Sequence, residues 1–159
     1  MLYFKRKSNE LSTTTQKEKL FKDAERQWNT LSTEKGAPGR KVDFEIYKSI
    51  LYNLEIRKVY LDSKLSLEKF SSIVGTNTTY LSNAVNNYFG CNFKRLINSY
   101  RVVRAKELLD GKDCPVNELF SRCGFASKSV FYVAFRKVVG MTPLQYISQS
   151  RNPFMIQRN

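Results

Sequence analysis

The side chains of this sequence that could do chemistry are amides, hydroxyls, thiols and basic groups, because it contains no histidine. The absence of histidine excludes Ser-His-Asp and Cys-His catalysis and His-containing zinc sites. Cys91, Cys114 and Cys123 form no C-x-x-C pair, and their odd number argues against a disulfide framework. The sequence also lacks a Walker loop and a Gly-x-Gly-x-x-Gly turn. We therefore expect a non-enzymatic protein without a metal or cofactor site, with reduced and mostly buried thiols.

Neutral hydrogen-bonding side chains gather within residues 78–87. Thr79, Ser82, Asn83 and Asn86 recur at spacings of three and four, which places them on one face of a helix. An asparagine amide can pair in bidentate fashion with adenine in the DNA major groove, and Asn83 or Asn86 has this chemistry. The alternative is an ordinary polar face exposed to water.

The basic residues indicate a polyanionic partner. The formal net charge is +13, from 27 Lys and Arg against 14 Asp and Glu. Residues 92–159 carry twelve basic and four acidic residues, a net of +8, whereas residues 41–91 carry six and five, a net of +1. This excess favours nucleic acid first and an anionic membrane surface second.

The apolar residues predict an all-α chain, since they recur at helical spacing without an alternating strand pattern. An N-terminal amphipathic helix is expected over residues 14–31. Its stripe of apolar residues packs either on its own chain or on a second copy of the chain. Two glycines and a proline mark a linker at 35–40. The further expected helices are 44–61, 67–74, 80–89, 93–110, 115–123 with Pro115 in the first turn, 130–138, and a last one capped by Thr142-Pro143.

One pattern occurs twice, about 50 residues apart. A short apolar helix leads into a glycine, Gly75 or Gly124, and a longer helix leads out and ends at Gly90 or Gly140. This is the plan of a helix-turn-helix, in which glycine suits the positive φ of the turn. Two such units occur in tandem, joined by the expected helix 93–110. We therefore predict that the second helix of each unit enters one of two successive major grooves, roughly 34 Å apart.

The segments that carry this pattern resemble the AraC/XylS family of bacterial transcription regulators. Residues 101–109 (RVVRAKELL) look like the connecting helix of that family, and residues 124–143 are similar to its signature stretch. Residues 60–62 followed by 65–67 resemble the entry to its first unit. The resemblance implies a seven-helix DNA-binding domain, gene activation more often than repression, and contact with RNA polymerase.

The resemblance also assigns residues to DNA. It matches Thr79, Ser82 and Asn83 to base-facing positions of the first unit, and Lys128, Ser129, Tyr132 and Val133 to those of the second. By chemistry Asn86 joins the first set, and Lys128 suits guanine acceptors. Side chains near helix ends could hold phosphates, or could simply be solvated: Asn77, Lys94, Arg95, Arg136, Lys137 and Thr142.

Two residues of the second unit depart from the family pattern. Phe120 lies four residues before Gly124, where the family has a small residue and where the first unit has Ser71. Its ring must push the two helices apart or turn outward. Val133 stands where a polar or basic residue is common. We therefore expect the first unit to carry most base recognition and the second mainly to bind the backbone.

The sequence divides into a basic extension with the amphipathic helix and linker (1–40), the DNA-binding domain (41–151) and a tail (152–159). The expected function is sequence-specific double-stranded DNA binding by a cytoplasmic transcription regulator, with no small-molecule site in the chain. A homodimer through helix 14–31 is the alternative to packing of that helix on its own chain. Alternatives are an adaptor that has lost DNA binding, and the output end of a larger sensor, tethered to the inner membrane through sequence preceding Met1. The order of aromatics and basic residues in 1–7 fits that tether.

Overall fold

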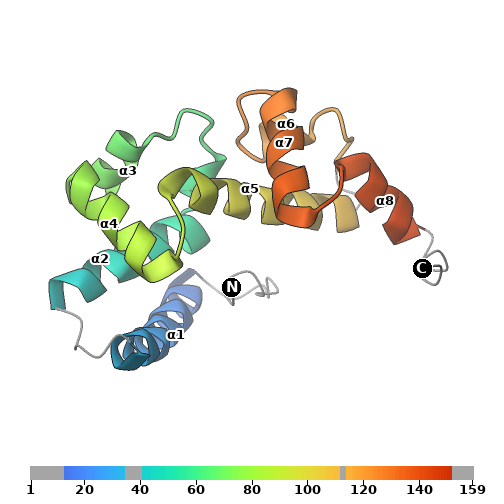
Figure 1. Cartoon of the computed structure of the whole chain (residues 1–159). Helices are drawn as coiled ribbons and strands as arrows, with labels where there is room; N and C mark the ends of the chain where they lie inside the picture. Colours follow the sequence, from blue (N-terminus) through green and yellow to red (C-terminus); the bar gives the residue numbers. More distant parts are fainter. Residues whose placement is uncertain (1–12, 35–40, 112–113, 152–159) are drawn as a thin grey trace. The chain divides into compact units, whose positions relative to one another are not determined.

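A computed structural model describes residues 13–34, 41–111 and 114–151 of the protein (Figure 1). In these ranges the chain forms helices and turns and no strand, which confirms the all-α prediction. The expectations for residues 1–12, for the linker at 35–40 and for the tail lie outside the described residues. The α-helices are α1 (Thr13–Glu34), α2 (Lys41–Leu51), α3 (Leu67–Val74), α4 (Thr78–Phe89), α5 (Phe93–Asp110), α6 (Leu119–Arg122), α7 (Lys128–Val139) and α8 (Pro143–Arg151).

These helices form two compact units. The first unit takes its described residues from 13–59 and 65–96, and the second from 60–64 and 97–151. Helix α5 contributes its first four residues to the first unit and the rest to the second. Each unit holds one helix-turn-helix: α3 with α4 in the first, and α6 with α7 in the second.

Helix α1 packs on the first unit of its own chain. Its stripe residues Leu20, Ala24 and Trp28 are buried in one core with residues of α2. The Trp28 ring lies 4.7 Å, centroid to centroid, from the ring of Tyr88 at the end of α4. The apolar stripe therefore contributes to the folding of the first unit, because in proteins the packing of an apolar face supplies most of the stability of a helix.

The single helix predicted over 44–61 is wrong. Helix α2 ends at Leu51, a π-helical turn follows over Tyr52–Ile56, and a 3₁₀ turn forms at Val59–Leu61. Lys58 between them has a φ of 52°, in the left-handed region. The break is stabilised by Asn53, which is buried and whose amide donates to the Ser49 carbonyl (2.9 Å) and accepts from Arg57 (3.1 Å).

The segment after the break belongs to the second unit. The buried guanidinium of Arg101 on α5 donates to the carbonyl oxygens of Tyr60 (2.7 Å) and Asp62 (2.9 Å). Its other neighbour is the ring of Phe125, 5.5 Å from the guanidinium carbon. Burial lowers the pKa of Arg101, and the nearby Asp62 opposes that shift. An arginine nevertheless stays charged at neutral pH, so these bonds are charge-assisted.

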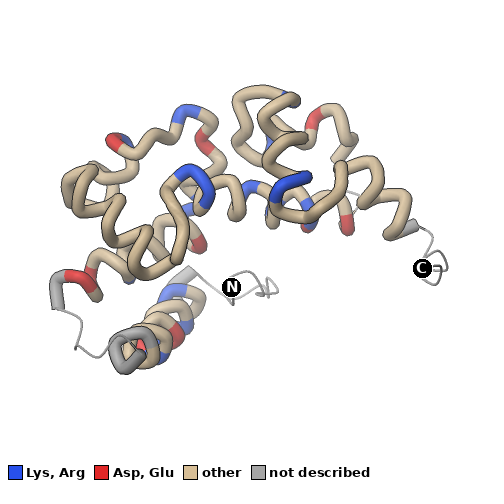
Figure 2. The backbone as a smooth tube through the Cα atoms, viewed as in Figure 1, with Lys and Arg blue, Asp and Glu red and all other residues tan. Residues whose placement is uncertain are grey.

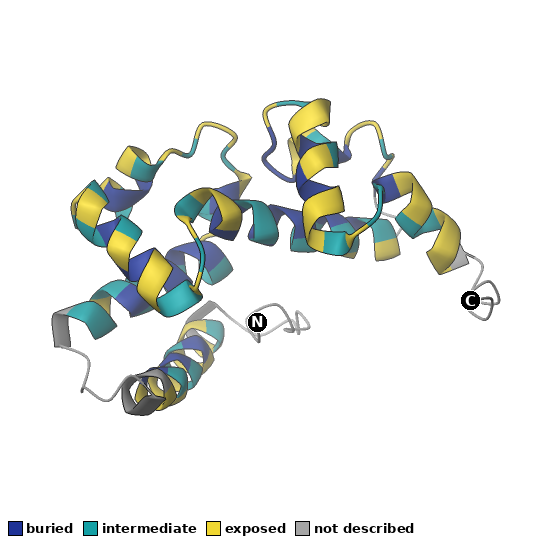
Figure 3. Cartoon of the chain, in the orientation of Figure 1, coloured by how far each residue is buried: buried dark blue, intermediate teal, exposed yellow. Residues whose placement is uncertain are grey.

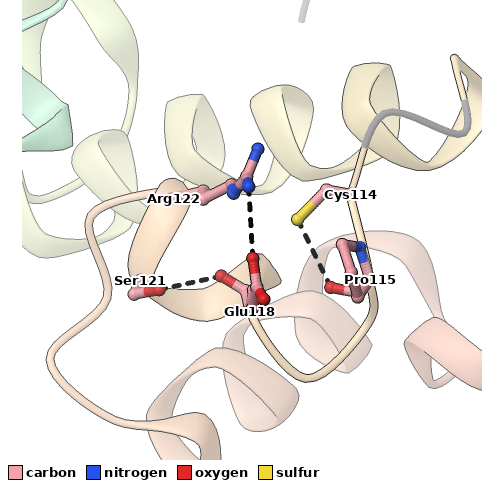
Figure 4. A network of polar contacts seen from close by, with 5 residues as sticks. All are labelled: Cys114, Pro115, Glu118, Ser121 and Arg122. Atoms are coloured by element: carbon pink, nitrogen blue, oxygen red, sulfur yellow. Dashed lines mark hydrogen bonds and ion pairs between the residues drawn. The ribbon is translucent and has the colours of Figure 1, made fainter.

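Helix α6 is shorter than the helix predicted over 115–123. Pro115 to Glu118 form a hydrogen-bonded turn, in which the Glu118 amide donates to the Pro115 carbonyl (3.0 Å), and the helix proper begins at Leu119. Figure 4 shows how Glu118 holds this region: its carboxylate pairs with Arg122 (3.1 Å), and its carbonyl accepts from the Ser121 hydroxyl (2.8 Å). Pro115 therefore lies before the helix and not in its first turn.

Neither a membrane-spanning helix nor a metal-binding cluster is found among the described residues. No described helix is long and apolar enough to cross a membrane. The described His, Cys, Asp and Glu residues likewise form no group of three that could hold a metal ion.

Candidate nucleic-acid interface

The first helix-turn-helix is fixed at three points, two of which lie at its turn. Ser66 caps α3 by accepting from the Lys69 amide (3.1 Å). Gly75 then reverses the chain with a φ of 84°, and its amide donates to the Ser71 carbonyl (2.9 Å). Ser71 itself is buried, as the requirement for a small residue there predicts. Asn77 caps α4 through its side-chain oxygen, which accepts from the Tyr80 amide (2.8 Å). The start of α4 is thus held rigidly.

The predicted base-facing residues of α4 share one face of that helix. Thr79, Asn83 and Asn86 are exposed and Ser82 is half-buried, while Leu81, Ala84 and Val85 form the buried side (Figure 3). The hydroxyls and amides of this outward face make no hydrogen bond with other described residues. Helix α4 carries no charged residue and is uniformly tan in Figure 2. Its outer face is therefore a neutral surface of donors and acceptors.

The cations predicted to hold phosphates in the first unit lie at the start of α5. Lys94 and Arg95 are exposed in its first turn. Asn92 caps this helix by accepting from the Arg95 amide (2.9 Å). A helix start is electropositive, so the two side chains add to a region already suited to anions. Asn77 differs from them, because its oxygen is committed to the cap and only its NH₂ group stays available.

The turn of the second helix-turn-helix is tighter than that of the first. Gly124 has a φ of 80°, and a Cβ atom there would lie 2.5 Å from the Tyr60 carbonyl oxygen. Ser127 caps α7 by accepting from the Val130 amide (3.3 Å). Phe120 is half-buried at the edge of the second core, so its ring is turned partly outward. That position is one of the two outcomes expected for a large residue there.

The outward face of α7 combines cations with apolar groups. Lys128 and Ser129 are exposed, and the Lys128 ammonium lies 5.7 Å from the centre of the Tyr132 ring. Tyr132 is half-buried and packs against the second core, so part of its ring is unavailable to a ligand. Val133 is 69% exposed. No acidic residue occurs in this helix.

The last turn of α7 and the cap of α8 hold the remaining predicted residues. Arg136 and Lys137 are exposed at the end of α7, where Figure 2 shows a continuous blue segment. Thr142 caps α8, as predicted, and its hydroxyl both accepts from the Gln145 amide (3.2 Å) and donates to the Gln145 side chain (3.1 Å). This hydroxyl is therefore engaged within the protein.

The thiols offer no reactive group to this interface. Cys114 and Cys123 are buried, and Cys91 is half-buried. Burial raises the pKa of Cys123 to about 12 and also raises that of Cys91. A thiol is nucleophilic only as the thiolate, so neither is activated near neutral pH.

Sequence reasoning missed two features of the interface. The first is the burial of Arg101, whose guanidinium ties the segment 60–64 to α5 through residues about 40 positions earlier, a contact that no local pattern indicates. The second feature is the exposure of Val130, one of the apolar residues that mark α7; Val133, which the resemblance matches to a base-facing position, is exposed as well. That exposure depends on how α7 is rotated against its core, and helical spacing alone leaves the rotation uncertain.

The chain belongs to the AraC/XylS-type helix-turn-helix family. A family model described as "Helix-turn-helix domain" matches residues 70–149, just over half of the 159 residues. The match extends from the middle of α3 to α8 and includes both turns.

Curated relatives share this region and continue well beyond it. The chain is 31% identical over 91 residues to "HTH-type transcriptional activator RhaR" of Enterobacter sp. (strain 638), a match that covers 57% of this chain and 32% of the relative. Across the curated relatives, the matched part spans between 12% and 40% of their length.

Solved structures show the same fold. The C-terminal domain of AraT, a response regulator from Geobacillus stearothermophilus, matches with a TM-score of 0.59 and 28% identity, over 66% of this chain and 84% of that domain. The DNA-binding domain of AdpA, a global transcriptional factor solved in complex with a target DNA, matches with a TM-score of 0.59 over 69% of this chain and 97% of that one. At 20% identity the second likeness concerns the fold alone.

Proposed function

We propose that the protein is a transcription regulator that binds double-stranded DNA in a sequence-specific manner and catalyses no reaction. The observation that carries this proposal is the outer face of α4. Its amides and hydroxyls point outward from a helix fixed by a side-chain cap at one end and a left-handed glycine at the other. Such a rigid, unsatisfied polar face is suited to base edges in a major groove. The names of the relatives, among them a transcriptional activator, support the same function.

Within this function we assign different tasks to different side chains. Asn83 and Asn86, with Thr79 and Ser82, recognise base edges by hydrogen bonds, because α4 offers no charge with which to bind phosphates. Lys94, Arg95, Arg136 and Lys137 bind phosphates, since each is exposed near a helix end. Lys128, Ser129 and Tyr132 form the corresponding face of α7, with Asn77 and Thr142 at the helix caps. Because α5 contributes residues to both units, one chain could engage two successive major grooves.

Selection of binding sites from random double-stranded DNA tests the proposal. The expected result is a defined site, bound by the full chain with an affinity that falls steeply with salt. Replacement Asn83→Ala should weaken binding to that site about tenfold and relax its base preference at one position. Asn117→Ala changes an exposed asparagine outside both helix-turn-helix faces and should leave binding unchanged. Failure to bind any duplex would contradict the proposal and favour an adaptor that has kept the fold without DNA binding.

Further parts of this proposal concern partners. Activation of transcription, with contact to RNA polymerase, is favoured by the name of the relative RhaR, and in vitro transcription from a selected site tests it. A homodimer through residues 14–31 would need another surface of α1, because Leu20, Ala24 and Trp28 are already buried. The lengths of the relatives leave room for this chain to be the output part of a larger sensor.

A further inference from the structure

Two valines stand exposed side by side on the outward face of α7. Val133 is 69% exposed and Val130 is 46% exposed. Their spacing of three residues makes them neighbours on the helix surface, and Ser129 and Arg136 lie on the same face. An exposed valine adds little to the core, and it forms helix less readily than alanine does. Neither packing nor helix formation therefore accounts for Val133.

The surroundings of these valines indicate what contacts them. Arg136 and Lys137, three and four residues after Val133, are exposed beside it on a helix that contains no acidic residue. A cationic rim of this kind favours a polyanion, because each phosphate it neutralises releases a counterion. Among polyanions, double-stranded DNA also offers an apolar partner in its major groove, namely the C5-methyl group of thymine.

We propose that Val133, with Val130 beside it, contacts thymine methyl groups in the major groove, so that the second unit selects thymine at defined positions. This inference rests on the proposed function. It assigns apolar base recognition to α7 beside the hydrogen-bonding recognition by α4. It thereby replaces the expectation that the second unit mainly binds the backbone.

Replacement of thymine by uracil tests the contact at the level of one methyl group. The probe is a duplex selected with the full chain, in which each thymine is changed in turn to deoxyuridine. Hydrogen-bonding groups and charges stay the same, and only the methyl group is lost. Removal of one buried methyl should weaken binding about fourfold at a contacted position and leave it unchanged elsewhere.

Two substitutions assign the effect to the valine. Val133→Ser removes both methyl groups, and serine and valine have similar helix propensities, so an exposed replacement should leave the fold intact. This variant should lose the uracil sensitivity at its position while keeping its sensitivity to salt. Val138→Ser is the matched control, because Val138 is 45% exposed on the same helix but about 140° around it from Val133. This control should retain the wild-type pattern.

The possible outcomes separate the valine contact from DNA binding itself. Uracil sensitivity that disappears in Val133→Ser supports the inference. Specific binding without uracil sensitivity at any position, or with sensitivity that Val133→Ser does not change, would overturn it and leave the proposed function intact. A selected site without thymine would overturn it in the same way, and a protein partner would then be the better occupant of this face. Failure to bind any duplex would contradict both the proposed function and the thymine contact.

Discussion

At the scale of single residues, Arg101 shows how a charge can organise an apolar core. Its guanidinium is buried, and it donates to two backbone carbonyls of a segment about 40 positions earlier in the chain. These bonds, together with the Tyr60 ring that lies 5.6 Å, centroid to centroid, from the Tyr100 ring of α5, hold the segment 60–64 in the second unit. Buried carbonyl groups without a donor are costly, which makes this arginine difficult to replace.

We expect Arg101→Leu to destabilise the protein by about 2–4 kcal/mol, because two charge-assisted bonds are lost and their acceptors stay buried. Urea unfolding of the full chain measures the change. Arg104→Leu is the matched control on the same helix: its guanidinium is partly exposed and pairs with Glu107 (3.0 Å), an interaction worth about 1 kcal/mol or less. Equal losses in the two variants would show that the bonds to Tyr60 and Asp62 contribute no special stability.

Gly124 is the second residue whose identity the packing dictates. We expect Gly124→Ala to cost about 3 kcal/mol or more, because a left-handed backbone penalty of about 1–2 kcal/mol adds to the overlap of Cβ with the Tyr60 and Leu61 carbonyls. Gly140 has nearly the same φ, 86°, but open space around it, so Gly140→Ala should show the backbone penalty alone. Thermal unfolding compares the two. A smaller loss at Gly124 than at Gly140 would mean that the segment 60–64 moves aside freely.

At the scale of elements, a hydrogen-bonded tyrosine joins α8 to α5. The Tyr146 hydroxyl donates to the Asp110 carboxylate (3.0 Å), and the Lys106 ammonium lies 5.4 Å from the centre of the Tyr146 ring. Burial, and then the bond to Asp110 and its charge, raise the pKa of Tyr146 to about 12. The fold therefore favours the neutral phenol.

This shift predicts a pH dependence with a definite sign. The folded pKa lies above the ordinary value of 10, so the contribution of Tyr146 is complete below pH 10 and is lost as the pH rises toward 12. We expect Tyr146→Phe to be less stable than the wild type by about 1 kcal/mol at neutral pH. The difference should shrink between pH 10 and 12, and the comparison cancels the lysines that titrate in both proteins. A difference that stays constant over this range would refute the assignment.

The sequence predicts the elements that carry their own local signals. Helix α4 has an asparagine cap, an apolar side repeating at helical spacing and a glycine at its end, and α7 has a serine cap with the same apolar repeat and final glycine. The outward faces followed from the same spacing. All of these signals act within one turn of helix, so they can be recognised without knowledge of the rest of the fold.

The break after α2 could not be predicted in this way. Residues on both sides of it are apolar at helical spacing, and neither glycine nor proline marks it. The two sides are buried in different units, Leu54 in the first and Tyr60 in the second. The spacing of apolar residues is the same whether they pack into one core or into two. The bonds that stabilise the change, from Arg101 to Tyr60 and Asp62, join residues about 40 positions apart and leave no local pattern.

At the scale of the whole molecule, charge and base recognition are distributed unequally. The net charge of +13 comes mainly from residues 92–159, whereas α4, with the richest hydrogen-bonding face, has no charge. Affinity and specificity should therefore respond to different substitutions. Changes on α4 should alter which sequence is bound, and loss of cations should weaken binding to every sequence.

The salt dependence of binding separates these two contributions in one measurement. We expect Arg136→Gln and Lys137→Gln each to weaken binding to a selected site and to random duplex by the same factor. Each should also reduce the slope of log affinity against log salt by about 1, because one phosphate contact is lost. Asn83→Ala should instead reduce affinity for the selected site alone and leave the slope unchanged, since an amide releases no counterion. If the two glutamine variants kept the wild-type slope while losing the selected site, these cations would be reading bases, and the division between α4 and the basic residues would be wrong.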